Sequence, residues 1–443
     1  MSQPRAAVFL TTLIAIAGLG TAARVEPTRG FERVDTPADA ELEAPHEAIV
    51  KFETATTFST AMHTIQDAGG LAARRSRSGA HFLVSLDPTV RVGEALERLG
   101  RLPGVAWAEP NGVVRKFGSA AELFRPNDSF FRFQWHWRLL NAERTWAIQT
   151  GDPSIVVAVL DTGIAFENFG PFRRAPDWGD TVFVPGLNVL DGSTHANDDD
   201  GHGTHVASTI AEGTNNLEGG AGLAFHCALM PVKVLDNRGL GSFFDVAEGI
   251  YYAFRDAPRK ARVINLSLGG PGSRTLTEAI DDAVRAGVVV VAASGNENST
   301  VSFPASHPGV IAVGAVDQRK QRAEYSNFGS SLDVVAFGGD VDRDDDRDGD
   351  PDGILQQTFS GRDAQRGIFN SFGYFYLNGT SQASPQVAAL AALLIRQGVT
   401  TPAGVQFAIQ ATAEDLGTRG RDDQYGHGLI QPAEALSGMG LNR

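Results

Sequence analysis

Three residues that lie far apart in the chain carry the side chains that a covalent attack on an amide requires. Asp161 follows the apolar run IVVAVL, His202 lies between a glycine turn and an Ala/Val-rich segment, and Ser381 begins a long apolar helical pattern. A serine hydroxyl is a weak nucleophile until a base takes its proton, and histidine is such a base at neutral pH. A carboxylate beside the imidazole fixes its tautomer and stabilises its charged form. These residue types predict acyl transfer by a triad of Asp161, His202 and Ser381.

A donor for the negative oxygen of the reaction intermediate is the fourth requirement, and Asn296 is placed to supply it. It follows the apolar run VVVVAAS and a glycine. Its side-chain amide can donate a hydrogen bond to the oxyanion, together with the backbone N–H of Ser381. We therefore include Asn296 among the expected catalytic residues.

Buried strands alternate with helices from about residue 134 to residue 436, and these elements must position the candidate residues. The strand candidates, each almost continuous in apolar residues, are SIVVAVLD, LMPVKVLD, VINLSL, VVVVAAS, VIAVGAVD and LDVVAFG. Such runs indicate strands covered on both faces, hence an α/β fold with a parallel sheet and helices on either side. Ligands of open sheets of this kind bind beyond the carboxyl ends of the strands, where polar residues directly follow these runs.

Residues 47–116 show a smaller pattern of strand, helix, strand, strand, helix and strand. The alternating strand positions are Ala48, Val50, Phe52, Phe82, Val84 and Leu86, and the helical spacing is that of Phe58, Met62, Ile65, Leu96, Leu99 and Leu102. This order predicts a small ferredoxin-like α+β domain ahead of the larger one. The fold serves many functions and by itself names none.

The N-terminus has the pattern of a secretory signal peptide. Residues 1–23 combine one arginine, an apolar stretch and a small-residue end. A membrane anchor is the alternative, but about 15 apolar residues fall short of the roughly 20 that span a bilayer. The aperiodic residues 117–133 indicate an exposed connection between the two domains.

Charge and cysteine content exclude several classes of function. A formal net charge of −14 argues against nucleic acid as a partner, because phosphate binding needs clustered lysine and arginine. Cys227 is the single cysteine, so no intramolecular disulfide can form, and stability must come from a large core, metal ions or both. Its apolar neighbours predict a buried thiol and not a nucleophile.

Five motifs in one order carry a resemblance to a known family. VAVLDTGI, GHGTHVAST, SLGG, AASGNEN and NGTSQASPQVAAL are similar to the hallmark segments of the subtilisin-like serine proteases. The match covers nearly all of residues 134–436, and residues 47–116 resemble the family's inhibitory propeptide. The expected domains are therefore a signal peptide (1–23), a linker (24–44), a propeptide (45–117), a linker with the autoprocessing region (118–133), the peptidase domain (134–436) and a tail (437–443).

The resemblance implies a secreted serine endopeptidase, extracellular or periplasmic, that acts as a monomer on polypeptide substrates. Its own propeptide would assist folding, occupy the cleft with its tail and be released by self-cleavage between about residues 114 and 130. After removal of the signal peptide no membrane association is expected. Two departures from the family's pattern, Ser208 in place of glycine and Phe337 in place of proline, lie outside the expected catalytic groups.

The resemblance also assigns the residues around the triad. It makes His202 the catalytic histidine and His205 a structural one. Backbone edges that pair with an extended substrate are implied at Ser267, Leu268, Gly269, Ser294 and Gly295. Ser302 is similar in position to the small residue at the floor of the specificity pocket, which suggests an open pocket for large apolar side chains, with Glu297 tolerating basic ones.

Residues 342–353 suggest a calcium site from their residue types alone. Asp344, Asp346 and Asp348 alternate ahead of Gly349, a spacing that wraps oxygen ligands around Ca²⁺. Asp350 and Asp352 are expected to complete the group. A solvated acidic loop is the alternative, but so many aspartates repel one another strongly without a cation.

A second calcium site is implied by the resemblance. The loop TNNLEGGAG is similar to the family's high-affinity calcium loop, with Asn216 as a side-chain ligand and Asp177 as a carboxylate from a neighbouring loop. The carbonyls implied as further ligands belong to Thr214, Glu218 and Gly220. The run at 198–200 is either a third cation site or an acidic wall of the cleft. No motif for an organic cofactor is present.

Two other functions fit the same sequence. The first is a catalytically silent, calcium-stabilised protein that binds peptides in the same cleft. The second is an exopeptidase of the same superfamily, which needs an insertion that blocks one end of the cleft. Residues 349–372 are the candidate for such an insertion.

Overall fold

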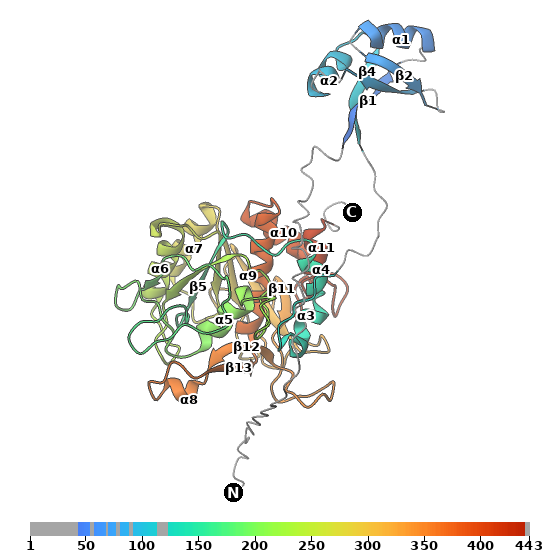
Figure 1. The fold of residues 1–443 in the computed structure, drawn as a ribbon. Coiled ribbons are helices and arrows are strands. Elements are labelled where there is room, and N and C mark those ends of the chain that lie inside the picture. The colour runs from blue at the N-terminus through green and yellow to red at the C-terminus, as the bar shows by residue number, and fades with distance from the viewer. Residues whose placement is uncertain are drawn as a thin grey trace, which may run out of the picture. The chain divides into compact units, whose positions relative to one another are not determined.

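The computed structural model describes residues 43–53, 57–67, 70–76, 80–87, 92–112 and 123–438. The chain divides into two compact units, residues 1–118 and 119–443 (Figure 1). The expected signal peptide, all but the last two residues of the expected linker 24–44, and residues 439–443 of the expected tail lie outside the described residues.

The first unit is a four-stranded antiparallel sheet with two helices. Its elements are β1 (Glu43–Phe52), α1 (Phe58–Asp67), β2 (Gly70–Arg75), β3 (His81–Leu86), α2 (Val92–Gly100) and β4 (Val105–Gly112), in the sheet order β2-β3-β1-β4. Val50, Phe82 and Val84 on one face of the sheet form a core with Ile65 and Leu99 of the helices. This element order and sheet order confirm the predicted ferredoxin-like plan.

The second unit is built on a seven-stranded parallel sheet. In spatial order its strands are β11 (Val334–Phe337), β10 (Val310–Val316), β9 (Val289–Ala293), β8 (Val263–Leu266), β5 (Val156–Asp161), β7 (Ala228–Lys233) and β6 (Leu187–Asn188). All six apolar runs of the sequence are strands, and each is buried along its whole length. The prediction of a parallel sheet covered on both faces is confirmed.

Helices pack on both faces of this sheet, as Figure 1 shows around α9. One core includes α5 (His202–Ala211) and α9 (Thr380–Arg396), and the other includes α6 (Phe243–Tyr251) and α7 (Arg274–Arg285). The shorter helices are α3 (Trp135–Leu139), α4 (Ala142–Trp146), α8 (Gly361–Ala364), α10 (Pro402–Thr412) and α11 (Pro432–Leu436), with single turns at Phe131–Phe133 and Tyr252–Asp256. Cys227 is buried in the first core, and burial raises the pKa of its thiol to about 12.

A hairpin that the sequence did not predict follows the sheet. β12 (Ile354–Phe359) pairs antiparallel with β13 (Phe372–Leu377), which runs toward Ser381. β12 is fully buried although Gln356, Gln357 and Thr358 are polar, because their side chains bond to buried partners. The segment 349–372 therefore contains one strand of a hairpin and the short helix α8.

The expectation that residues 117–133 form an exposed connection is wrong for its C-terminal half. Phe124 packs against Trp146 and Phe225 with ring centroids 6.0 and 5.8 Å apart, and Asp128 is only 6 % exposed. The apolar area of these side chains is removed from water on the second unit, so residues 124–133 belong to that unit.

Two histidines lie in the core as neutral rings. Both ring nitrogens of His136 are buried without a hydrogen-bond partner in the described part of the chain, and His205 Nε2 bonds to the carbonyls of Ile354 and Phe375 at 3.0 and 3.2 Å. Burial lowers the pKa of His136 to about 3 and that of His205 to about 4, and repulsion from a neighbouring histidine adds to both shifts.

We expect the buried His136 to make folding sensitive to acid. Below the unfolded value of about 6.5 the unfolded chain binds a proton that the folded chain does not, so stability is lost as pH falls. Replacing His136→Phe removes this loss. Denaturant unfolding on a Ser381→Ala background measures this. Between pH 7 and pH 5 the free energy of unfolding of the protein with His136 should fall by about 2 kcal/mol more than that of the His136→Phe variant. A difference that stays constant with pH contradicts a buried neutral imidazole.

Candidate active site

Asp161 is the last residue of β5, at the carboxyl edge of the parallel sheet. Its side chain is fully buried, and Oδ1 accepts a hydrogen bond from the Thr162 N–H at 2.7 Å. The same oxygen lies 2.7 Å from His202 Nδ1. A buried carboxylate needs such partners, because it has lost its hydrogen bonds to water and is destabilised unless protein groups replace them.

His202 is the first residue of α5 and keeps a side-chain exposure of 28 %. Burial lowers the pKa of this imidazole, but the Asp161 carboxylate outweighs burial through its charge and its hydrogen bond. With further attraction from Asp200 and Asp198, the pKa of His202 is raised to about 9. Because Nδ1 faces Asp161, Nε2 is the nitrogen left to face a substrate or a nucleophile.

Ser381 lies in the first turn of α9, and its backbone is tied to the end of β8. Its hydroxyl donates to the Ser267 carbonyl at 3.3 Å, and the Ser267 hydroxyl donates to the Ser381 carbonyl at 2.9 Å. A cavity of about 310 Å³ is lined by Ser381, His202 and Asn296 together. The structure thus brings to one cavity three groups that the sequence separates by up to 179 positions (202 to 381).

Asn296 has its amide orientation fixed by the start of α9. Its Oδ1 accepts hydrogen bonds from the Thr380 N–H and from the Thr380 hydroxyl, each at 2.9 Å. This occupies the acceptor end of the side chain, so the Nδ2 hydrogens are left for a ligand in the cavity beside Ser381.

A second cavity of about 610 Å³ also has Ser381 and Asn296 in its lining. Its lining includes Leu268, Gly269, Gly295 and Ser302, four of the residues expected to bind substrate. Gly295 has φ +107°, and a Cβ there would run into the Asn327 amide, so only glycine keeps this entrance open.

Ser294 and Ser267, the other two expected substrate-binding residues, lie beside and beneath these cavities. Ser267 lines a third cavity, of about 420 Å³, next to His202. Ser294 is fully buried, and its carbonyl already accepts from the Ser302 N–H at 2.9 Å and from Asn327 Nδ2 at 3.1 Å. Ser294 therefore braces the pocket, and its carbonyl is not available to a substrate strand.

Two features of the cleft were not found from the sequence. Asn327 Nδ2 also bonds to Glu297 Oε2 at 2.7 Å and to Ser302 Oγ at 3.2 Å, which fixes the floor of the larger cavity. The third cavity has an apolar lining that includes Leu240 and Phe243. Asn327 meets Glu297 and Ser302 from 30 and 25 positions away, and Leu240 and Phe243 are exposed apolar residues of one segment, so neither set carries a motif.

The comparisons with known proteins place the second unit in a family. Residues 152–428 match the model of the Subtilase family. The chain belongs to this family. The subtilase is 36% identical over 338 residues to a thermophilic serine proteinase of Bacillus sp. strain AK1, a match that spans 76% of this chain and 74% of that protein. It is 36% identical over 299 residues to subtilisin DY of Bacillus licheniformis, spanning 66% of this chain and 94% of that protein.

A solved structure agrees with these relatives. A protease from Pseudoalteromonas arctica superposes on the subtilase with a TM-score of 0.59 at 33% sequence identity, covering 70% of this chain and 98% of that one. The family match and the sequence identities establish that this subtilase is a subtilisin-like serine endopeptidase, and so confirm the resemblance seen in its motifs.

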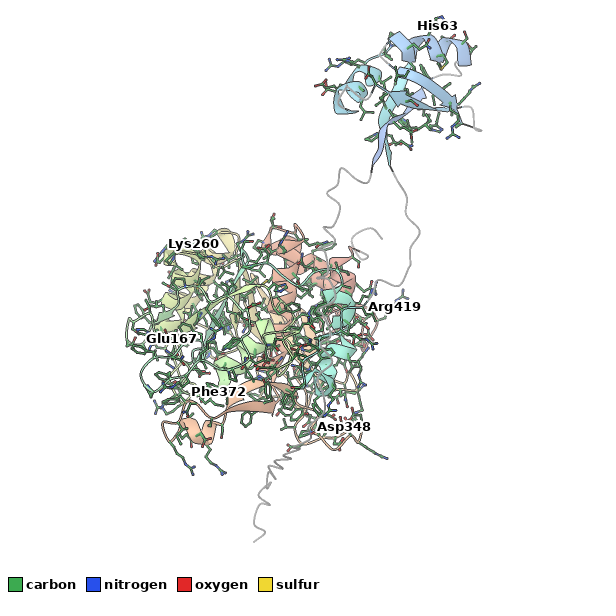
Figure 2. All side chains as sticks on the ribbon, in the orientation of Figure 1. His63, Glu167, Lys260, Asp348, Phe372 and Arg419 are labelled. Carbon is green, nitrogen blue, oxygen red and sulfur yellow. The ribbon has the colours of Figure 1, made fainter. Side chains whose placement is uncertain are left out.

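The acidic loop of the subtilase brings three of its expected calcium ligands together. Ligand atoms of Asp344, Asp346 and Asp348 all lie within 4.8 Å of one another on the surface, where Figure 2 labels Asp348. Asp350 lies close to these three carboxylates. Burial is the largest cause that raises the pKa of its carboxyl group, and repulsion from the three is the next. Asp352 is buried and accepts from the Asp345 N–H at 2.6 Å, so it braces the loop from beneath.

The other two expected ligands are also in contact. Asn216 Nδ2 donates to Asp177 Oδ1 at 2.7 Å, and Asp177 Oδ2 accepts from the Gly220 N–H at 3.0 Å. Burial, with a smaller contribution from the charge of Asp128, outweighs these hydrogen bonds and raises the pKa of Asp177 to about 6. Asp128 itself accepts from the backbone N–H groups of Asn215 and Asn216 at 2.8 and 3.0 Å.

Asp128 was not among the predicted ligands. It lies within residues 117–133, for which the sequence predicts an exposed connection. Glu212 was not predicted either. It is fully buried, its Oε2 has no partner among the described residues, and burial, with repulsion from Asp177, raises its pKa well above the ordinary value.

The acidic run before His202 is not a set of free carboxylates. Asp199 Oδ1 lies 2.6 Å from the amino group of Lys233, whose side chain is 5 % exposed. Asp200 lines the third cavity and accepts from the His202 N–H at 3.1 Å. Of the two alternatives for residues 198–200, the position of Asp200 favours an acidic wall.

The charges around His202 predict the pH dependence of the reaction. If His202 is the general base, it must be neutral, so kcat/KM should rise with pH through an inflection above the ordinary histidine value of about 6.5. Replacing Asp200→Asn removes an attractive charge and should move the inflection to lower pH, while Asp191→Asn, an exposed control in the same loop, should not. Rates on a peptide amide at fixed ionic strength measure this. An inflection below 6.5, or one unmoved by Asp200→Asn, contradicts the charge assignment.

Proposed function

We propose that Asp161, His202 and Ser381 form the catalytic triad of a secreted endopeptidase made as a zymogen. The observation that carries the proposal is the 2.7 Å contact between Asp161 Oδ1 and His202 Nδ1, in a site where His202 and Ser381 line one cavity. Asp161 fixes the tautomer that leaves Nε2 unprotonated. The Ser381 hydroxyl turns from the Ser267 carbonyl toward Nε2, gives up its proton and attacks the peptide carbonyl carbon.

The intermediate places its negative charge on the former carbonyl oxygen. Asn296 Nδ2 and the backbone N–H of Ser381 donate to this oxygen, and Thr380 holds the Asn296 amide in the required orientation. His202 then protonates the departing amine, which leaves an ester on Ser381. Water, deprotonated by His202, attacks this ester and restores the free hydroxyl.

Two cavities that share Ser381 in their linings support cleavage within a chain. The 610 Å³ cavity receives the side chain on the acyl side, and the 310 Å³ cavity receives the leaving side. Backbone groups at Ser267, Leu268, Gly269 and Gly295 pair with the extended substrate. The volume of the larger cavity suits a large apolar residue, and Glu297 at its wall tolerates a basic one.

The first unit serves as the propeptide, and its release leaves the second unit as the mature monomer. Since Phe124 and Asp128 are packed into the second unit, self-cleavage falls upstream of them, within the N-terminal part of the range expected from sequence. Export rests on the signal pattern of residues 1–23. In the described part of the chain, no helix has the length and apolar character needed to cross a bilayer.

Calcium fits two of the acidic groups. In the first, Asp177 bonds to Asn216, the charges of Asp128, Asp177 and the buried Glu212 repel one another, and none of the three carboxylates has an ion pair among the described residues. A divalent cation supplies the missing positive charge there. In the second, the exposed Asp344, Asp346 and Asp348 hold the ion at the surface.

A Ser381→Ala variant tests the function directly. N-terminal sequencing of the wild-type protein should find a new terminus between about residue 114 and Phe124. The wild-type protein should also form a fluorophosphonate adduct on Ser381 and cut a denatured protein at internal bonds. The Ser381→Ala variant should keep its first unit, form no adduct and cut no internal bonds. Ser437→Ala, a serine of the C-terminal helix end, is the matched control and should behave as wild type. Normal trimming of Ser381→Ala in the absence of another protease would contradict self-processing, and release of terminal residues alone would indicate an exopeptidase.

Removal of calcium tests the metal sites. Because the ion binds only the folded chain, calcium at 100-fold above the Kd of a site should stabilise the Ser381→Ala protein by about 2.7 kcal/mol for that site, and EGTA should abolish this. Asp128→Asn should lower the calcium-dependent stabilisation of the folded protein. Asp180→Asn, which changes an exposed carboxylate nearby, should leave that stabilisation unchanged. Thermal unfolding at several calcium concentrations measures both. A melting temperature independent of calcium would contradict the assignment.

A further inference from the structure

Asp198 is a buried carboxylate beside the triad that the mechanism above does not use. It is 1 % exposed. Its Oδ1 accepts from the Thr162 hydroxyl at 2.8 Å and from the backbone N–H groups of Asp200 and Gly201 at 3.0 and 2.9 Å. Its Oδ2 accepts from the Thr204 N–H at 2.9 Å and from the Thr204 hydroxyl at 2.6 Å. Five neutral donors thus crowd a carboxylate that has about four lone-pair sites, which leaves little capacity for a cation.

The two threonines that Asp198 joins flank the two members of the Asp–His pair. Thr162 directly follows Asp161, and its hydroxyl also accepts from the Gly203 N–H at 2.9 Å. Thr204 lies two residues after His202, and its hydroxyl also accepts from the Ala165 N–H at 3.0 Å. Each threonine hydroxyl thus accepts a hydrogen bond from the segment of the other threonine, so hydrogen bonds join the end of β5 to the start of α5 at two points.

Lys233 holds the same turn from its opposite side. Its amino group donates to the Thr162 carbonyl at 2.7 Å, to Asp199 Oδ1 at 2.6 Å and to the Leu235 carbonyl at 2.8 Å. The turn after Asp161 is then fixed at its hydroxyl by Asp198 and at its carbonyl by Lys233. Groups held from two sides lose little further freedom when a substrate binds, which is the condition for preorganisation.

We propose that Asp198 is a positioning residue for the reaction: by bridging Thr162 and Thr204 it keeps Asp161 Oδ1 and His202 Nδ1 at hydrogen-bond distance before substrate arrives. It acts on the base and not on the substrate, because Asp198 and Thr204 line none of the four cavities whose lining includes His202 or Ser381. This inference rests on the proposed triad. It gives the first aspartate of the acidic run a role that is neither a cation ligand nor a wall of the cleft.

The test uses a pair of substitutions that differ by one hydroxyl. Thr204→Val keeps the shape and the backbone bond to Asp198 Oδ2 but removes the hydroxyl, which donates to Asp198 Oδ2 and accepts from the Ala165 N–H, and Thr204→Ser keeps the hydroxyl. In the processed enzyme, with active molecules counted by fluorophosphonate labelling, Thr204→Val should lower kcat about 10-fold to 100-fold with KM within about twofold. Thr204→Ser should stay within about threefold of wild type. Asp191→Asn, an exposed carboxylate in the same loop, should leave both constants unchanged.

A second variant and a spectroscopic readout keep the proposal testable if Thr204→Val does not fold. Asp198→Asn retains the shape of the side chain, and it should lower kcat with little change in KM. The proton shared by Asp161 and His202 gives a strongly deshielded NMR resonance, which should weaken or move upfield in Thr204→Val and Asp198→Asn and persist in Thr204→Ser. An unchanged resonance and unchanged kcat in folded variants would overturn the positioning role.

The outcomes separate this inference from the proposed function. The wild-type protein could lack peptidase activity and still show the deshielded resonance, with its sensitivity to Thr204→Val. That result would support the positioning role of Asp198 and overturn the proposed catalytic use of the triad. An active wild type whose kcat and resonance do not respond to either variant would leave the triad standing and overturn the bridge.

Discussion

The hydrogen bond between Asp161 Oδ1 and His202 Nδ1 joins a fully buried carboxylate to a ring at the edge of the cleft. Oδ1 receives one further donor, the Thr162 N–H, and Oδ2 has no partner in the described part of the chain. The imidazole is therefore the main group that can balance the buried negative charge. This requirement fixes where α5 must begin, because its first residue has to reach the end of β5.

The parallel sheet makes that meeting possible. Its strands all end at one edge, so Asp161 after β5, Ser267 after β8 and Asn296 after β9 are neighbours without any local sequence relation. The central helix α9 then brings Ser381 to the same edge, and its first residue, Thr380, bonds to Asn296. An added Cβ at Gly203 would run into the Gly163 carbonyl oxygen and lie 3.1 Å from the Asp161 Cβ, so the close approach of α5 leaves no room for a larger residue there.

The features that could be predicted from sequence were those with a period or a motif. Strands such as β5 and β9 are continuous apolar runs, and the ferredoxin-like unit alternates clearly, so both folds followed from patterning. The hairpin β12–β13 did not, because Gln356 and Gln357 are polar and are buried only through bonds to Gln134, Asp177 and Glu212 far away in the chain.

The same limit applies within the site. Asn327 and Asp128 act through contacts with residues about 25 to 90 positions distant, which no spacing rule reports. Ser294 lies in a recognised motif, but the motif does not show that its carbonyl is already used by Ser302. A motif therefore identifies the reacting atoms better than it identifies the groups that support them.

Cys227 determines how the fold of the enzyme responds to reducing agents. The thiol is fully buried, and its raised pKa keeps it protonated and unreactive. With no other cysteine in the chain, no covalent cross-link is open to attack by glutathione, thioredoxin or a laboratory reductant. Reductants that open the disulfides of a protein substrate therefore have no disulfide bond to attack within this chain.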